Sequence, residues 1–226
     1  MILYKENFNN GEPEFIDLAD GHMDIDAGVI RFAGDIDERI TEDPLRMLRV
    51  ARFATELGFW PEEELVSKIR KNASLIYTVS KERWTLEMDK LLTGKYPAFG
   101  LSVLEDTELL RYIIPELWLQ VGFDQDTPHH HLTLWEHTKK VVSLSPEDPE
   151  IRWGALLHDV GKPYAKKKNY KGNSSYYMHA KIGAELARGI AYRLKWSAAR
   201  TEKVCMLILE HMNDGNPIRD ADNHAK

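Results

Sequence analysis

An apolar run that ends on an adjacent histidine and aspartate is the feature that most constrains the fold of this chain. Residues 153–157 are apolar and predict a buried helix, and His158 and Asp159 follow them directly. We expect Gly161 and Pro163 to stop this helix, because proline cannot continue a helix and glycine suits a sharp exit. A buried imidazole and carboxylate cost free energy unless a partner compensates them, and a divalent metal prefers both groups as ligands. Alone, the pair is better explained by a histidine bonded to a backbone carbonyl and an aspartate that caps a turn.

Three further histidines lie beside apolar residues that have the spacing of amphipathic helices: His137, His179 and His211. With His158, four predicted helices therefore each carry one histidine next to an apolar face, and Asp159 adds a carboxylate. This combination predicts a metal site inside a helical bundle.

The order of these residues resembles that of the HD domain, a family of helical, metal-dependent phosphohydrolases, over roughly residues 128–226. The family pattern is a histidine, a His-Asp pair, often further histidines and a distal aspartate. The first histidine and the His-Asp pair match it position by position, and the other two histidines resemble those of members that hold a second metal. The resemblance implies that one or two divalent ions are held by His137, His158, Asp159, His179, His211 and a distal aspartate.

Three aspartates could supply the distal carboxylate: Asp214, Asp220 and Asp222. We select Asp222, although the residues that follow are too few to predict a full last helix. The implied cofactor is a divalent metal, with Mg, Mn, Ni, Co and Fe as the alternatives. Asp159 could also orient the attacking water, and Lys162 is a candidate catalytic contact to the phosphate.

A second informative stretch predicts a helix over residues 41–58, with Thr41 as its N-cap and Gly58 just past its last turn. Four charged residues lie on or beside one face of this helix: Glu42, Asp43, Arg46 and Arg49. Their spacing by itself is explained by ion pairs within a helix on a solvated face.

Residues 42–59 also resemble the E-D-x-x-R segment of class II tRNA nucleotidyltransferases, the CCA-adding and poly(A) polymerase-like enzymes of bacteria. The strand and turn before the segment are similar as well, and many members carry an HD domain downstream. The resemblance implies that Asp43 and Arg46 contact the base edge of a nucleotide, to which a carboxylate and a guanidinium are suited. It further implies that Glu42 orients the arginine and that Arg49 supports it or contacts a phosphate.

The catalytic head of that family, with its glycine-rich loop and two metal-binding carboxylates, is expected to be missing. Asp24 and Asp26 form a D-x-D, but no glycine-rich loop precedes them, and we interpret the stretch as a polar turn between strands at 15–18 and 29–32. We therefore expect that this chain does not transfer nucleotides by itself.

The sequence thus predicts a mainly α protein in three parts. These are a β-rich remnant of the nucleotidyltransferase head at 1–40, a helical neck and body at 41–122, and an HD-type helical bundle at 123–226. Body helices are expected at 62–72, 81–93 and 99–114; loops are expected at 123–131, with three consecutive histidines, and at the lysines of 166–168 and 171.

Composition narrows the function further. A net charge of −6 argues against sequence-blind binding to long nucleic acid, but not against a basic patch that touches one RNA. The single cysteine, Cys205, excludes an internal disulfide and fits a reducing compartment. No span of about 18 apolar residues is present, so we expect a cytoplasmic protein without a membrane partner.

The leading functional hypothesis is an HD-type phosphohydrolase acting on small nucleotides or RNA 3′ ends such as 2′,3′-cyclic phosphates, as the resemblance implies. The alternative is a nucleotide- or tRNA-binding fragment, or one subunit of a split CCA-adding enzyme whose head is a separate polypeptide. A truncated product with an inactive HD site is the third reading.

Overall fold

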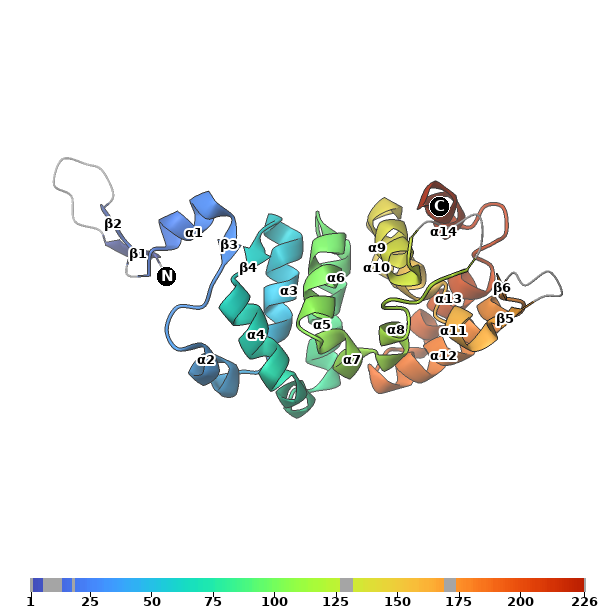
Figure 1. Cartoon of the computed structure of the whole chain (residues 1–226), viewed down its shortest axis with the longest axis horizontal. Helices are drawn as coiled ribbons and strands as arrows, with labels where there is room; N and C mark the ends of the chain where they lie inside the picture. The colour runs from blue at the N-terminus through green and yellow to red at the C-terminus, as the bar shows by residue number, and fades with distance from the viewer. Residues whose placement is uncertain (1, 6–13, 18, 127–131, 169–173, 226) are drawn as a thin grey trace.

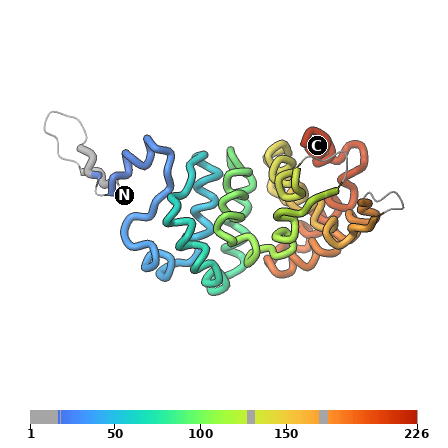
Figure 2. Tube along the Cα trace, viewed as in Figure 1, coloured from blue at the N-terminus to red at the C-terminus, as the bar shows by residue number. Residues whose placement is uncertain are grey.

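The computed structural model describes residues 2–5, 14–17, 19–126, 132–168 and 174–225. Within them the protein is mainly α-helical, as predicted, with three two-stranded sheets. The molecule is elongated, and the chain runs from the N-terminal strands at one end to the C-terminal helices at the other (Figures 1 and 2). No helix in this part of the chain is long and apolar enough to cross a membrane.

The N-terminal part holds more helix than predicted. Its elements are β1 (Ile2–Lys5), antiparallel to β2 (Glu14–Asp17), then α1 (Gly21–Ala27), β3 (Val29–Ile30) and α2 (Ile36–Glu42). The polar turn predicted around Asp24 and Asp26 is wrong, because these residues lie in α1. The Asp17 carboxylate accepts the His22 amide N–H (2.8 Å), and Gly28, with a φ of 66°, ends the helix. Turn-forming residues here therefore cap a short helix.

The helix predicted over 41–58 is two helices. Thr41 lies in the last turn of α2, and α3 (Leu45–Leu57) begins only after Pro44. Asp43 is extended, with a φ of −147°, since a proline disfavours the helical conformation in the residue before it. Gly58 follows α3 with a φ of 70°, which confirms the predicted C-cap.

The body packs on α3 and is helical, as expected. It contains β4 (Trp60–Pro61), parallel to β3, and then α4 (Glu63–Asn72), the 3-10 helix η1 (Ala73–Thr78), α5 (Lys81–Thr93), α6 (Pro97–Asp106), α7 (Leu109–Ile113) and α8 (Pro115–Trp118). The helix predicted over 99–114 is divided, because Glu108 adopts a left-handed conformation with a φ of 56°.

The C-terminal bundle surrounds the His-Asp pair. Its elements are α9 (Leu134–Leu144), α10 (Pro149–Leu157), α11 (Lys162–Ala165), β5 (Lys167–Lys168), β6 (Ser174–Ser175), α12 (His179–Arg193), α13 (Ala198–Leu209) and α14 (Pro217–Ala225). Two expectations are wrong here. Pro163 does not stop α10 but lies in the first turn of α11, where proline is tolerated, and residues 217–225 do form a last helix.

Body and bundle share a buried junction. The Asp89 carboxylate on α5 accepts from Trp153 Nε1 (2.6 Å) on α10 and pairs with Arg200 (2.5 Å) on α13. Thr85 Oγ1 donates to the Leu194 carbonyl (2.9 Å) behind α12. These contacts fix the helices that carry the histidines against the body.

Candidate metal centre and basic cavity

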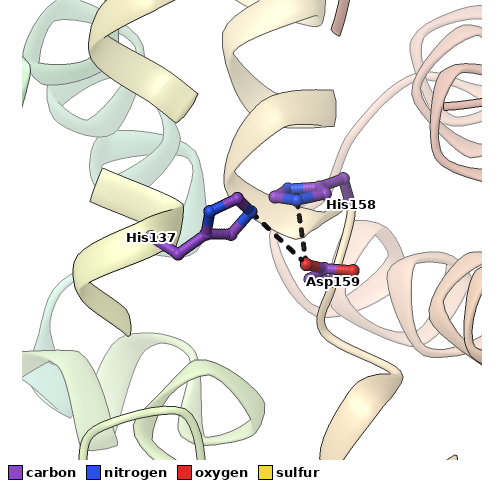
Figure 3. A group of neighbouring side chains, drawn as sticks. All are labelled: His137, His158 and Asp159. Atoms are coloured by element: carbon purple, nitrogen blue, oxygen red, sulfur yellow. Dashed lines mark ion pairs between the residues drawn. The ribbon is translucent and has the colours of Figure 1, made fainter. Parts of the chain in front are cut away.

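Three elements of the bundle bring two histidines and two carboxylates together. His137 Nε2 on α9 lies 3.0 Å from Asp222 Oδ1 on α14, and His158 Nε2 lies 3.0 Å from Asp159 Oδ2 after α10. His137 Nε2 also lies 3.7 Å from Asp159 Oδ2, so the pair after α10 faces α9 (Figure 3). We call His137, His158, Asp159 and Asp222 the first ligand set.

Asp159 also faces a second pair of histidines. Its Oδ1 lies 3.4 Å from His179 Nε2 and 4.0 Å from His211 Nε2, and these two nitrogens are 3.3 Å apart. His179 opens α12 and His211 follows α13. We call Asp159, His179 and His211 the second ligand set, which Asp159 joins to the first by giving one oxygen to each.

Backbone carbonyls orient three of the imidazoles. The Nδ1 atoms of His158, His179 and His211 lie 2.7, 2.8 and 2.7 Å from the carbonyl oxygens of Ala155, Tyr176 and Ile208. Each carbonyl belongs to the residue three positions earlier, where helix ends and turns leave carbonyl groups free. With Nδ1–H donating to the carbonyl, the Nε2 lone pair points into the cluster, as in metal-ligating histidines.

Burial and charge prepare these groups for a cation. Burial lowers the pKa of His179, and it lowers that of His211 to about 4, so both imidazoles are neutral at pH 7. Burial opposes ionisation of Asp159, yet His158 and Lys162 hold its pKa well below the usual range. Asp222, likewise buried, has a lowered pKa because of His137 and His158. The pKa of His158 is raised despite its burial, because Asp159 and Asp222 attract a proton that a metal would replace.

The donor atoms fit one or two divalent ions. His158 and Asp159 are 0 % and 1 % exposed, and His158 Nε2 and both Asp159 oxygens make no well-directed hydrogen bond. Within each of two triads, His137-His158-Asp159 and Asp159-His179-His211, one ligand atom per residue lies within 4.8 Å of the others. Divalent transition metals bind buried imidazole nitrogens and carboxylate oxygens that lack well-directed hydrogen bonds.

A cavity of about 310 Å³ opens onto both ligand sets and carries positive charge at its edge. Lys162 Nζ lies 2.7 Å from Asp159 Oδ2 and 3.0 Å from Gln125 Oε1. Arg219 also lines the cavity, held by Asp214 at 2.6 Å. Gln125 and Arg219 were not among the residues predicted from the sequence. Arg219 stands one helical turn before Asp222 and could have been found from that spacing, whereas Gln125 gives no sequence signal.

The E-D-x-x-R segment forms a second, separate constellation. Glu42 Oε2 lies 2.5 Å from Arg46 Nη1 and 3.0 Å from Arg39 Nη1, and Arg46 also donates to the Arg39 carbonyl (2.7 Å). Asp43 lies 3.6 Å from Arg49 and 3.3 Å from Arg83. The structure therefore brings all four predicted residues to the junction of α2 and α3.

A basic cavity of about 400 Å³ lies beside that junction. Its charged lining residues are Arg31, Arg39, Arg46, Arg49, Arg52, Glu87 and Lys90. Glu87 is the one carboxylate among these lining residues, and it pairs with Arg49 (3.4 Å) and Arg52 (3.0 Å). Arg46 and Arg49 thus line the cavity. Glu42 and Asp43 do not line it but pair with these two arginines.

Only part of the polar segments predicted as loops falls within the described residues. The three consecutive histidines, 129–131, and Lys171 lie outside the described residues. Lys167 and Lys168 are exposed and form β5 rather than a loop, and Lys166 Nζ donates to the Asp124 carbonyl (2.8 Å).

Comparisons with known proteins match two parts of the chain to known families. Residues 58–120 match the family described as "Probable RNA and SrmB-binding site of polymerase A", and residues 129–225 match the HD domain. The chain is 36 % identical over 188 residues to the CC-adding tRNA nucleotidyltransferase of Thermus thermophilus, covering 78 % of this chain and 43 % of that protein. It is 32 % identical over 209 residues to the A-adding tRNA nucleotidyltransferase of Deinococcus radiodurans, covering 87 % and 47 %.

A solved structure shows the same fold. The CCA-adding enzyme of Bacillus stearothermophilus, in complex with CTP, superposes with a TM-score of 0.51 at 23 % identity, over 93 % of this chain and 52 % of that one. The chain spans about half the length of the curated relatives that it matches.

Proposed function

This chain is homologous to the CCA-adding tRNA nucleotidyltransferases and carries an HD domain, and on that premise we propose that it hydrolyses phosphoester bonds of nucleotides, 2′,3′-cyclic phosphates among them, with one or two divalent ions. The observation that supports the proposal is the position of Asp159, whose two oxygens face separate histidine pairs at the floor of a cavity. A bound divalent ion would supply an activated water and offset the charge that develops on the phosphoryl oxygens.

The residues around the cavity have distinct roles in this proposal. The two ligand sets would hold the ions, and the carbonyl-bonded Nδ1 atoms would keep His158, His179 and His211 in the tautomer that ligation requires. Asp159 is also placed to accept a hydrogen bond from the attacking water and so orient it. Lys162 and Arg219, which line the same cavity, would contact the substrate phosphate.

Removal of metal tests this function. We expect hydrolysis of 2′,3′-cyclic AMP in the presence of Mn²⁺ or Ni²⁺, and a fall of at least about a hundredfold after chelation, because the ion supplies several kcal/mol of transition-state stabilisation. Re-addition of the metal should restore the rate. Product formation would be followed by chromatography, and metal content by atomic spectroscopy. Turnover that survives chelation, or no turnover with any of Mg²⁺, Mn²⁺, Ni²⁺, Co²⁺ and Fe²⁺, would contradict the proposal.

A second function, nucleotide binding at the neck, is supported by the basic cavity. Five arginines and one lysine line it against one carboxylate, which gives a strong attraction for phosphates. In this role the chain would act as a nucleotide- or tRNA-binding fragment or as a subunit that requires a separate head. Nucleotide addition would then be observed only when such a head is supplied.

Substitution of Arg46 tests this second function. We expect Arg46→Ala to weaken ATP and CTP binding by roughly 10- to 100-fold, because charge-assisted hydrogen bonds from the guanidinium are lost. Calorimetric titration would measure it. Arg188→Ala is the matched control, since Arg188 is exposed on α12 and pairs with Glu202 far from the cavity. Equal affinities of the two variants would exclude the basic cavity as the nucleotide site.

A further inference from the structure

An apolar groove of about 610 Å³ continues from the metal cavity across the surface of the bundle. It shares Lys162, His179 and Met212 with that cavity. The remaining residues of the groove are Tyr176, Tyr177, Met178, Ala180, Lys181 and Leu209. Its surface is almost wholly apolar, whereas the neighbouring cavity is lined by ligands and cations. A molecule that fills both therefore has a phosphate at one end and an apolar body at the other.

One wall of the groove is built into the turn that carries His179. The Tyr176 carbonyl accepts both the amide N–H of His179 (3.1 Å) and its Nδ1–H (2.8 Å). Between them Met178 has a φ of 69°, a left-handed conformation that a methionine rarely adopts. Tyr177 is 83 % exposed. The turn thus fixes the groove residues and a metal ligand relative to each other.

Other lining residues of the groove lie beside His211. Leu209 and Met212 flank His211 in the sequence and are 52 % and 57 % exposed. His211 itself is buried and held by the Ile208 carbonyl. Groove residues therefore lie beside both histidines of the second set, and a group bound in the groove lies next to that set.

Lys162 connects the two compartments. Its Nζ lies 2.7 Å from Asp159 Oδ2 and 5.6 Å from the centre of the Tyr176 ring. An anionic group at Lys162 consequently has the metal ligands on one side and the tyrosine face on the other. Continuity with the metal cavity, rather than exposure alone, distinguishes this apolar surface from scattered exposed side chains.

We propose that the groove binds the aromatic base of a nucleotide whose phosphate occupies the metal cavity, an inference that rests on the proposed phosphohydrolase function. Tyrosine rings and methionine sulfurs are flat or polarisable surfaces that pack on aromatic rings. Stacking of this kind recognises the face of a base and tolerates any base. The substrates are therefore nucleotides, free or at an RNA end, rather than small aliphatic phosphoesters.

A binding experiment tests this without requiring turnover. The probes are AMP and ribose 5-phosphate, which has a hydroxyl in place of the base. Both are titrated into the Mn²⁺-loaded protein of residues 1–226 carrying Arg46→Ala, which weakens binding at the basic cavity. We expect AMP to bind at least about tenfold more tightly, and Tyr177→Ala to weaken AMP binding about tenfold while leaving ribose 5-phosphate unchanged. Tyr192→Ala is the matched control, because Tyr192 is 79 % exposed on α12, the helix that follows Tyr177, and does not line the groove.

Equal affinity for the two probes, or an equal loss for both in Tyr177→Ala, would overturn the proposal. Tyr177-dependent AMP binding by a protein that hydrolyses nothing would refute the phosphohydrolase function and leave the groove as a base site. A further comparison distinguishes the two sources of the ligand. Tighter binding of a short RNA ending in a 2′,3′-cyclic phosphate than of AMP, with the same loss in Tyr177→Ala, would assign the groove to an RNA end rather than a free nucleotide.

Discussion

Asp159→Asn is expected to lower metal-dependent hydrolysis of 2′,3′-cyclic AMP by about a thousandfold and to reduce the bound metal at both ligand sets. The substitution keeps the shape of the side chain but removes its charge. Oδ2 lies 3.0 Å from His158 Nε2 and Oδ1 lies 3.4 Å from His179 Nε2, so a single change affects both sets. The amide nitrogen is no metal ligand, and one of the two sets loses its carboxylate oxygen outright.

Two further variants make the expectation specific. Asp222→Asn should weaken mainly the first set, because Asp222 lies 3.0 Å from His137 and 3.9 Å from His158, whereas the second triad consists of Asp159, His179 and His211. Asp220→Asn is the matched control, since Asp220 is exposed on the same helix α14. Metal content measured by atomic spectroscopy should therefore fall for both sets in Asp159→Asn, for one set in Asp222→Asn and for neither set in Asp220→Asn. Wild-type metal content in Asp159→Asn would show that this carboxylate does not join the two sets.

The grouping of the histidines was accessible from the sequence, because each lies beside an apolar helical pattern. His137 lies within α9, His179 opens α12, and His158 and His211 follow α10 and α13. The position of the distal carboxylate was not. Ile218, Ala221, Asp222 and Ala225 are the buried residues of α14. That periodicity favours Asp222 over Asp220 only if residues 217–225 are taken to be helical. The few residues after Asp214 did not predict a helix, so the prediction of Asp222 did not rest on this periodicity.

Other features depend on tertiary structure and could not be read from local patterns. Gln125 and Lys162 are 37 positions apart in the sequence, so the local sequence around either residue does not predict their contact. The break between α2 and α3 is different. Pro44 is a local signal for this break, because proline disfavours the helical conformation at Asp43, whereas Thr41 is a good N-cap residue that favours a helix start there. In the polar N-terminal stretch, the residues predicted to form a turn instead lie in and cap the short helix α1.

Gly161→Ala should destabilise the protein by about 3 kcal/mol, although glycine here has an ordinary backbone conformation. A Cβ at this position would lie 2.1 Å from the His179 carbonyl oxygen and 2.7 Å from the Gly183 amide nitrogen. Both are backbone atoms of α12 and cannot rotate away. The segment after Asp159 must therefore move from α12, which separates Asp159 from His179. We expect loss of metal at the second set before loss of metal at the first.

Gly189→Ala provides the matched control on the same helix. A Cβ at Gly189 meets no described atom within 4 Å, and this position lies inside α12, where alanine is favoured over glycine by up to about 1 kcal/mol. Urea unfolding of the metal-free proteins should thus shift in opposite directions for the two substitutions. Gly161 contributes no ligand atom, so a change in stability at this position reports the packing of the two backbones. A Gly161→Ala variant as stable as wild type would mean that α12 does not pack on the His-Asp segment. The close approach of these two backbones, rather than any side chain of residue 161, is what places the second pair of histidines within reach of Asp159.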